Sequence, residues 1–140
     1  MTSSWIQVAA AIIERDGQVL LTQRLPDTHL GGFWEFPGGK RQTEETLEAC
    51  VKREVLEELG IEISEPQPFA SLRYSYPDKN VELHFFSCSV VRGELQALGC
   101  AQYSWVRPDE FSRYEFPPAD IPIVEKLREQ ASARSFLSHS

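Results

Sequence analysis

The apolar run that begins at Ile6 constrains the fold most, because three charged residues, Glu14–Asp16, end it after eight positions. A membrane-spanning helix needs about 20 apolar residues, and no run of 18 or more occurs in the sequence. No basic region precedes the run, so we do not expect a signal peptide. Val8 and Ile12, separated by small alanines, instead predict a buried strand over residues 6–15 that turns at Asp16–Gly17.

The remaining strands are predicted from alternation and from turn residues. We expect strands over residues 18–24, 69–76 and 102–106, with a short extended piece around Trp34–Phe36 inside a loop rich in glycine and proline. Another strand starts at Val81. Its apolar residues change phase between Phe85 and Phe86, which predicts a β-bulge at that point.

Two helices complete the expected fold. The first covers Leu47–Leu59, with Thr46 or Thr43 as its N-cap and Gly60 as its stop. The second has Asp120 or Ile121 as its N-cap and Pro122 in its first turn. Strands and helices in this order predict an α/β (α+β) fold, in which helices cover both faces of a mixed sheet.

Length and composition favour one folded domain. The 140 residues, 41% apolar and 25% charged, predict a single domain over residues 1–130, and residues 131–140 are expected to be a frayed tail. The net charge of −7 argues against nucleic acid or an anionic membrane as a partner. Three scattered cysteines suit a reducing cytoplasm and a structural role inside the core.

The first helix ends on a cluster of carboxylates. Glu54, Glu57 and Glu58 are spaced i, i+3 and i+4, so they share one face, and that face continues the apolar stripe of the helix. Acidic groups in a last turn oppose the helix dipole, and the two glutamates four residues apart repel each other. Glu44 and Glu48, by contrast, are expected to be ordinary solvated residues.

Bound cations would relieve this cluster. Oxygen ligands without a nearby histidine or cysteine suit Mg²⁺, with Mn²⁺ as a second choice, and this predicts metal-assisted attack on a phosphate ester or anhydride. Arg53 could orient the carboxylates or bind phosphate. Gly38–Gly39 either permit a ligand to approach the backbone or simply form a tight turn.

These residues resemble the Nudix box in full. The matching positions are Gly39, Glu45, Arg53–Glu54–Val55, Glu57–Glu58 and Gly60–Ile61. The segments "TQRLPDTHLGGFWEFPGGK", "YPDKNVELHFF" and "FPPADIPIVEKL" also resemble the MutT-type branch, the nucleoside triphosphate pyrophosphohydrolases. The resemblance implies an α/β/α sandwich and a metal-dependent reaction that releases a nucleoside monophosphate and pyrophosphate.

The resemblance also implies roles for individual residues. Glu54, Glu57 and Glu58, with the Gly38 carbonyl, would be metal ligands. Glu45 and Arg53 would hold the loop–helix–loop and orient the carboxylates of the catalytic set, which comprises Glu45, Arg53, Glu54 and Glu57. Arg24 would contact phosphate.

One position departs from the family pattern. MutT-type enzymes often carry another glutamate six residues before a tryptophan, but here Gly99 stands six residues before Trp105. Glu94 is the nearest acid. The identity of the general base and the number of metals therefore stay open.

Asp120 occupies the place where MutT-type relatives present Asn or Asp to the base, although an aspartate there is also a good helix cap. When ionised it would accept hydrogen bonds from guanine, 8-oxoguanine or cytosine. Phe36 and Tyr76 could form walls of the base slot or simply pack in the core. His29 receives no role.

The leading hypothesis is an Mg²⁺-dependent enzyme that converts 8-oxo-dGTP to 8-oxo-dGMP and pyrophosphate, which would cleanse the nucleotide pool. A CTP or modified dCTP pyrophosphohydrolase is the alternative, since "PADIP" occurs in such relatives too. A non-catalytic nucleotide-binding module is a remote third, because all the box glutamates are present. Monomer and homodimer are both open.

Overall fold

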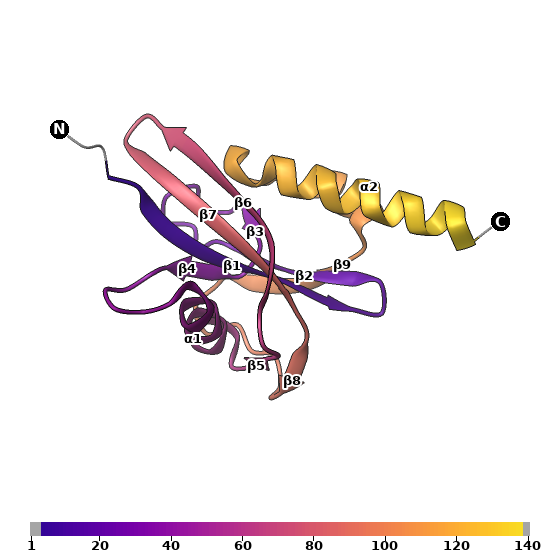
Figure 1. Cartoon of the computed structure of the whole chain (residues 1–140), viewed down its shortest axis with the longest axis horizontal. Helices are drawn as coiled ribbons and strands as arrows, with labels where there is room; N and C mark the ends of the chain where they lie inside the picture. Colours follow the sequence, from indigo (N-terminus) through magenta and orange to yellow (C-terminus); the bar gives the residue numbers. More distant parts are fainter. Residues whose placement is uncertain (1–3, 139–140) are drawn as a thin grey trace.

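The computed structural model describes residues 4–138, in which a mixed sheet lies between two helices (Figure 1). The predicted fold class is therefore confirmed. Neither helix is both long and apolar enough to cross a bilayer, within the part of the chain that is described. In chain order, the elements are β1 (Ile6–Arg15), β2 (Gln18–Gln23), β3 (Trp34–Glu35), β4 (Gly38–Lys40), α1 (Leu47–Leu59), β5 (Glu62–Ile63), β6 (Gln67–Tyr76), β7 (Lys79–Cys88), β8 (Val90–Arg92), β9 (Gln102–Val106), the 3-10 helices η1 (Pro108–Arg113) and η2 (Pro118–Asp120), and α2 (Ile121–Ser138).

Strand β1 is the centre of the sheet and is buried on both faces. Ala10 and Ile12 pack in the core under α2, whereas Ala11 and Ile13 pack in a second core under α1. Successive residues of a strand point to opposite faces, so a strand that is apolar at consecutive positions needs cover on both sides. This requirement produces the three layers seen in Figure 1.

Helix α1 has the predicted bounds. Its N-cap is Thr46, whose hydroxyl accepts a hydrogen bond from the Ala49 N–H at 3.0 Å. Gly60 ends the helix with a φ of 72°, a left-handed conformation that glycine adopts without a Cβ clash. Val51 and Val55 are fully buried against the sheet.

The predicted bulge is present opposite Phe85 and Phe86, but the extra residue belongs to the partner strand β6 and not to β7. The pairing of β7 with β1 is continuous from Val81 to Cys88, and the register shift lies in the partner strand β6, between Pro68 and Ala70. The apparent change of phase has another cause. Phe85 contributes to the core under α2 and Phe86 to the core under α1, so the apolar side switches because the covering helix changes.

The predicted frayed tail is also wrong for residues 131–138, which continue α2 as far as Ser138, while residues 139–140 lie outside the described residues. The sequence after Pro122 contains no glycine or proline that would stop a helix. The extension runs toward the β1–β2 hairpin, where Arg134 Nη1 lies 3.9 Å from Glu14 Oε2.

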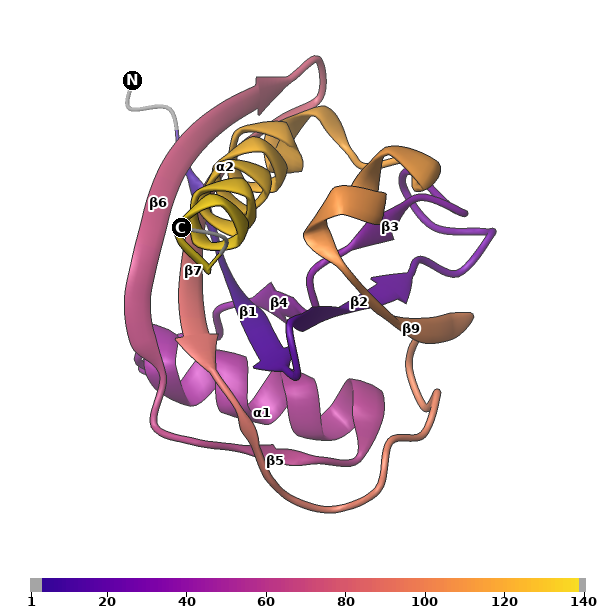
Figure 2. The same ribbon diagram turned by 90° about the vertical axis from the view of Figure 1, so that its right-hand side faces the viewer.

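The sheet splits beside β1, and this split positions the site. Strand β1 pairs with β2 only near the hairpin, at Glu14 and Arg15, and from Val8 to Ala10 it pairs with β4 instead. Figure 2 shows β2, β3 and β9 diverging from β1, β4 and β7. Strand β4 was not predicted from the sequence.

The two glycines of β4 form neither the expected turn nor an open approach for a ligand. A Cβ on Gly38 would collide with the Ala9 carbonyl oxygen, and a Cβ on Gly39 would collide with the Glu54 carboxylate. Both glycines therefore make room for atoms of the protein itself: Gly38 for the backbone of β1, and Gly39 for a carboxylate of α1.

We expect Gly38→Ala to lower the free energy of unfolding by about 1–3 kcal/mol, because the new methyl group must displace backbone rather than a flexible side chain. Urea denaturation of the metal-free protein measures this. Gly99→Ala is the matched control, since the nearest atom to its Cβ would be Glu58 Cα at 3.4 Å. Equal losses in the two variants would contradict the assignment.

Candidate active site

Arg53 joins helix α1 to the loop that precedes it. Its Nε and Nη2 bind the two oxygens of Glu45 at 2.6 and 3.0 Å, and Nη2 also donates to the Lys40 carbonyl at 3.1 Å. A two-pronged pair of this kind fixes both position and orientation. These hydrogen bonds lower the pKa of Glu45 to about 2, so Glu45 is ionised at neutral pH.

The same guanidinium reaches the carboxylates of the last turns of α1. Arg53 Nη1 lies 2.8 Å from Glu54 Oε1 and 3.2 Å from Glu57 Oε2. Glu54 is partly buried, while Glu57 is 59% exposed. Arg53 therefore supplies the positive charge that compensates the acidic end of the helix.

Glu58 turns away from Arg53 toward the sheet. Burial raises its pKa to about 8, and the charges of Glu35 and Glu54 add to the rise, while Thr22 and the Gly38 backbone offset part of it. A carboxyl group that resists ionisation this strongly lacks local positive charge.

The described residues contain no group of three or more His, Cys, Asp or Glu side chains already arranged around one metal position. The reason is visible in the contacts: Arg53 occupies the space between Glu54 and Glu57, and Glu58 points to the sheet. The donor set nevertheless fits a hard divalent cation, because it is made only of oxygens and carries excess negative charge.

A cleft of about 140 Å³ adjoins this cluster at the split in the sheet. Its floor is apolar and comes from β1 and β7, and Lys40 and Lys79 lie on its rim. Arg24, Glu35 and Asp120 provide its other charged or polar side chains. The sequence-predicted Arg24, Phe36, Gly38 and Asp120 all line the cleft, so the fold brings them together.

Two predicted wall residues take different positions. Phe36 is 3% exposed and stacks on Phe116 at 5.9 Å, so it belongs mainly to the aromatic core. Tyr76 does not line the cleft. Burial raises the pKa of Tyr76 and the charge of nearby Asp120 adds to the rise, while a hydrogen bond with the Ala119 backbone opposes it. The Tyr76 ring packs edge-on against His29, with the ring centroids 5.3 Å apart.

Asp120 is almost fully buried, at 6% exposure, and closes η2 just before α2 begins. Burial raises its pKa to about 8; Glu35 adds to this rise and Arg24 opposes it. With this pKa, Asp120 favours its neutral form at pH 7, a state of protonation that the sequence had left open. A neutral carboxyl group both donates and accepts hydrogen bonds.

Arg24 is already engaged by the protein. Its Nη1 lies 2.9 and 3.1 Å from the two oxygens of Glu35, and its Nε donates to the His29 carbonyl at 2.6 Å. Glu35 was not predicted as a site residue, because residues 34–36 were expected only as a short extended piece. Strand alternation in "WEF" places Glu35 on the face opposite its aromatic neighbours, and that signal could have found it.

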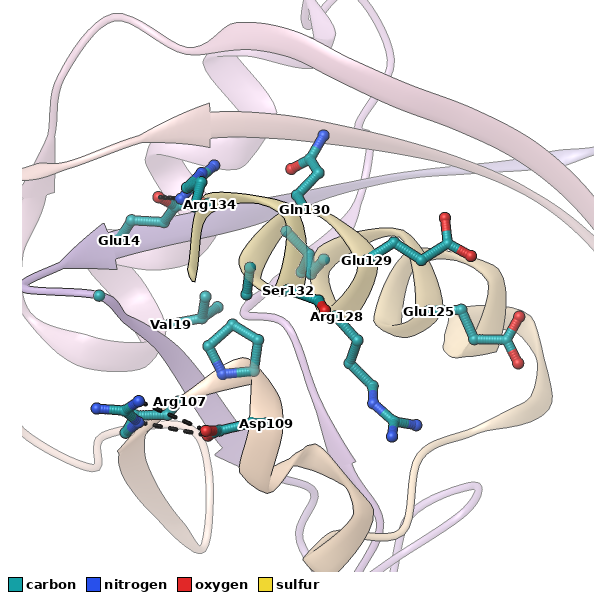
Figure 3. Close-up of a pocket in the computed structure, with 14 residues that line it drawn as sticks. Glu14, Val19, Arg107, Asp109, Glu125, Arg128, Glu129, Gln130, Ser132 and Arg134 are labelled. Atoms are coloured by element: carbon teal, nitrogen blue, oxygen red, sulfur yellow. Dashed lines mark hydrogen bonds and ion pairs between the residues drawn. The ribbon is translucent and has the colours of Figure 1, made fainter. Parts of the chain in front are cut away.

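A larger groove of about 1000 Å³ lies elsewhere, between α2, η1 and the β1–β2 turn (Figure 3). Its rim is charged and includes an ion pair in which Arg107 Nε lies 3.3 Å from Asp109 Oδ1. None of the sequence-predicted site residues lines this groove.

Comparison with known proteins places the chain in a family. A family model described as "NUDIX domain" matches residues 8–126. The chain is 39% identical over 129 residues to the CTP pyrophosphohydrolase of Escherichia coli K12, covering 92% of this chain and 96% of that protein. It is 33% identical over 124 residues to the 8-oxo-dGTP diphosphatase of the same strain, covering 88% and 96%.

Solved structures agree with these matches. The solution structure of the E. coli ORF135 protein superposes with a TM-score of 0.79 at 38% identity, covering 94% of each chain. A MutT structure from a study of Aliivibrio salmonicida and Vibrio cholerae superposes with a TM-score of 0.72 at 31% identity, covering 91% of this chain and 99% of that one. With the complete box folded around Arg53, these matches show that the chain belongs to the Nudix family and is a hydrolase.

Proposed function

We propose that this Nudix hydrolase cleaves a nucleoside triphosphate between its α and β phosphates and releases a nucleoside monophosphate and pyrophosphate. The observation that carries the proposal is the position of the carboxylate cluster of α1, which adjoins a cleft with an apolar floor and a buried hydrogen-bonding carboxyl group. The carboxylate cluster suits a metal-bound polyphosphate, and the cleft with its buried carboxyl group suits a nucleotide base.

Glu54, Glu57 and Glu58, with the Gly38 carbonyl, would hold Mg²⁺, or Mn²⁺ in its place. A divalent cation supplies charge neutralisation and polarises phosphoryl oxygens. Arg53 donates one hydrogen bond to each oxygen of Glu45, and the shorter of the two, at 2.6 Å, is shorter than its contacts with Glu54 and Glu57. This geometry suits a permanent structural pair. We therefore expect Glu45 to keep Arg53 in place when Glu54 and Glu57 turn to the cation.

Positive side chains around the cleft suit the polyphosphate. Lys40 and Lys79 lie on the rim, and Arg24 lines the wall with one arm held by Glu35. In a chain with a net charge of −7, these cations, together with a divalent cation at the carboxylate cluster, would reverse the sign of the local field. Phosphate binding by Arg24 stays a prediction.

Asp120 would read the base. A neutral carboxyl group offers a donor next to an acceptor, and this pair matches the cytosine edge, where the N4 amino group adjoins the N3 acceptor. The N7–H and O6 of 8-oxoguanine offer a similar pair. Contact of Tyr76 with the base stays a prediction, since Tyr76 lies near Asp120 but does not line the cleft.

We place cytosine nucleotides first and 8-oxo-dGTP second. The 39% identity to a CTP pyrophosphohydrolase, against 33% to an 8-oxo-dGTP diphosphatase of the same strain, supports this order. We also propose a cytoplasmic location, because Cys50, Cys88 and Cys100 are all free and buried, as suits a reducing compartment.

The proposed function predicts the products of a nucleotide panel. CTP, dCTP, 5-methyl-dCTP, 8-oxo-dGTP and dGTP are incubated with the protein and Mg²⁺, and the products are identified by mass spectrometry. We expect monophosphate and pyrophosphate, with a cytosine nucleotide giving the highest kcat/KM. Release of diphosphate and inorganic phosphate, or no turnover of any nucleotide, would refute the proposal. Faster turnover of 8-oxo-dGTP would reverse the order of the bases.

Glu57→Gln tests the metal face. We expect kcat to fall at least about 100-fold, since even outer partners of metal ligands contribute 10- to 100-fold. Glu48→Gln, on the first turn of the same helix, is the control and should keep its activity. Circular dichroism checks that both variants are folded. Full activity of Glu57→Gln would remove this residue from the metal site.

Asp120→Asn tests the neutral carboxyl group. The folded pKa of Asp120 is about 8, against an ordinary value of 3.8, so the folded state holds the proton more tightly. Its contribution to stability is complete below about pH 3.8 and is lost as pH rises toward 8. The asparagine variant has no such titration, so its Tm relative to wild type should rise between pH 4 and pH 8. Asp27→Asn, at an exposed position, should show no trend, and a constant difference for Asp120→Asn would contradict its neutral state.

A further inference from the structure

The turn that carries Glu45 is held in place by Arg41. Arg41 Nη1 donates to the Glu45 carbonyl at 2.9 Å and to the Gln42 carbonyl at 3.3 Å, so one nitrogen joins both ends of the turn. Within the turn, the Glu45 N–H donates to the Gln42 carbonyl at 3.2 Å, and Glu45 Oε1 accepts from the Gln42 N–H at 3.0 Å. Glu44 has a φ of 67°, a conformation that residues with a Cβ keep only where surrounding contacts hold it.

Arg41 is itself anchored to the sheet through Gln7. The Arg41 N–H donates to the Gln7 carbonyl at 2.9 Å, and Arg41 Nε donates to Gln7 Oε1 at 2.6 Å. The other end of the Gln7 amide, Nε2, donates to Glu82 Oε1 at 3.1 Å. Gln7 of β1 and Glu82 of β7 are direct partners in the parallel ladder, so this bond joins two neighbouring strands. Because both ends of the amide are used, its orientation is fixed.

Glu82 forms the fixed end of this connection. Arg73 Nε lies 2.9 Å from Glu82 Oε2, and His84 Nε2 lies 2.7 Å from Oε1, the oxygen that Gln7 also contacts. Hydrogen bonds from Gln7, His84 and Arg73 lower the pKa of Glu82 to about 2, so this carboxylate is ionised at neutral pH. Arg41, Gln7 and Glu82 therefore form a continuous brace between the turn and the sheet.

The brace lies on the face of the sheet that is turned away from the cleft. The neighbours of Gln7 and Glu82 in the two strands line the cleft: Ile6, Val8, Val81 and Leu83. Successive residues of a strand point to opposite faces, so Gln7 and Glu82 face the side of α1, and Arg41 reaches Gln7 on that side. The brace therefore acts on the site through the turn and not by contact with a nucleotide in the cleft.

Metal binding would make Arg53 more dependent on the turn. If Glu54 and Glu57 turn to a cation, Arg53 keeps the Glu45 carboxylate and the Lys40 carbonyl as partners. That carbonyl belongs to the same peptide unit as the Arg41 N–H, which is bonded to the sheet. Both remaining supports of the guanidinium are then held by the brace.

We propose that Arg41, supported by Gln7 and Glu82, is a positioning residue of the reaction. It holds the turn so that Glu45 keeps Arg53 in place when the carboxylates of α1 turn to the cation. The inference rests on the proposed function and adds residues that are not among the matching positions of the Nudix box. A pair of exposed charges contributes little to stability, so the effect of Arg41 falls on metal affinity and kcat.

Arg41→Ala removes the hold on the turn, and Lys52→Ala is its matched control. Lys52 is a cation on α1 next to Arg53, and its Nζ lies 2.6 Å from Glu65 Oε2, so its loss changes the net charge equally while its partner lies outside the turn. Electron paramagnetic resonance of free Mn²⁺ measures the Kd for Mn²⁺ in the nucleotide-free protein. At saturating Mg²⁺, kcat and KM are measured on the nucleotide that wild type hydrolyses best.

We expect Arg41→Ala to raise the Kd for Mn²⁺ and to lower kcat by about tenfold each, the lower end of the range for residues that orient metal ligands. KM should stay within about threefold of wild type, because the brace does not face the cleft. Lys52→Ala should match wild type, and the two variants should agree in Tm within about 3 °C. Equal losses in both variants, or a higher KM with unchanged kcat and Kd, would overturn the proposal.

Amide hydrogen exchange of the metal-free protein, followed by NMR, examines the turn directly. The N–H groups of Gln42 and Glu45 are bonded within the turn, whereas the Ala49 N–H is bonded to the Thr46 cap. We expect Arg41→Ala to speed exchange of the first two by at least about tenfold and to leave Ala49 unchanged. Unchanged exchange at Gln42 and Glu45 would show that the turn does not need Arg41.

Arg41→Lys keeps the charge and the fold if Arg41→Ala proves unstable. A lysine is a point charge without the planar fork, so it cannot serve the Gln7 amide and two carbonyls at once. Its kcat should lie within about threefold of that of Arg41→Ala. Wild-type activity of Arg41→Lys would mean that charge alone suffices, which contradicts a positioning role.

Gln7→Ala tests whether the brace is continuous. It should lower kcat and raise the Kd for Mn²⁺, as Arg41→Ala does. The double variant should be within about twofold of Arg41→Ala alone, because residues that act in one hydrogen-bonded chain are not additive. Losses that multiply in the double variant would show that the two residues act separately and would remove Gln7 and Glu82 from the proposal.

The two levels of proposal fail in different ways. If wild type releases no monophosphate from any nucleotide, the proposed function fails, and the claim that Arg41 serves this reaction fails with it. If wild type is active and Glu57→Gln is inactive, but Arg41→Ala keeps full kcat and full Mn²⁺ affinity, only the positioning role is overturned.

Discussion

The charge of one guanidinium holds the catalytic half of this protein together. Arg53 contacts Glu45, Glu54 and Glu57 and a main-chain carbonyl of β4, so the loop, the helix and the neighbouring strand meet at a single side chain. Without it, the last turns of α1 would combine like charges with an opposing helix dipole. Lysine could not replace it, because a point charge lacks the planar fork that serves several oxygens at once.

Several carboxyl groups without a fully compensating positive charge lie on the sheet side of Arg53. Glu58 and Asp120 both have a pKa of about 8, and the charge of Glu35 contributes to each shift. Burial of such groups costs stability that apolar residues would not cost. Asp120 and Glu35 line one cleft, and Glu58 lies near enough to Glu35 to feel its charge, which explains the cost, since perturbed acids cluster where ligands and protons are handled.

The elements that depend on local patterns could be predicted from sequence. The bounds of β1, α1 and β9, the Thr46 cap and the Gly60 stop follow from apolar runs and end signals that act over a few residues. The Nudix box also identified the residues that Arg53 gathers. The wrong predictions for β7 and β4 share a cause, because both features depend on contacts between distant parts of the chain. The apolar side of β7 changes with the helix that covers it. Strand β4 forms because residues 8–10 of β1 have no partner in β2.

Site residues were predictable to the extent that a motif marked them. Glu35 and Thr22 lie outside the box, and their relation to Glu58 arises from pairing between β2 and β3 rather than from spacing in the sequence. The protonation of Asp120 was equally out of reach, since it depends on burial and on Glu35 and Arg24, residues distant in the chain. The fold, in contrast, needed only the order of strands and helices.

The two glycines of β4 determine which parts of the cleft can change. On the metal side, the space beside Gly38 is filled by main chain of β1 and the space beside Gly39 by the Glu54 carboxylate. No change of side-chain rotamer can widen or narrow the part of that wall beside Gly38. New substrate preferences must therefore arise at the opposite wall, where the β6–β7 turn and η2 present side chains that can be exchanged without moving a strand. The metal and phosphate side of the site is therefore constrained by backbone, while the side chains that contact the base can be substituted.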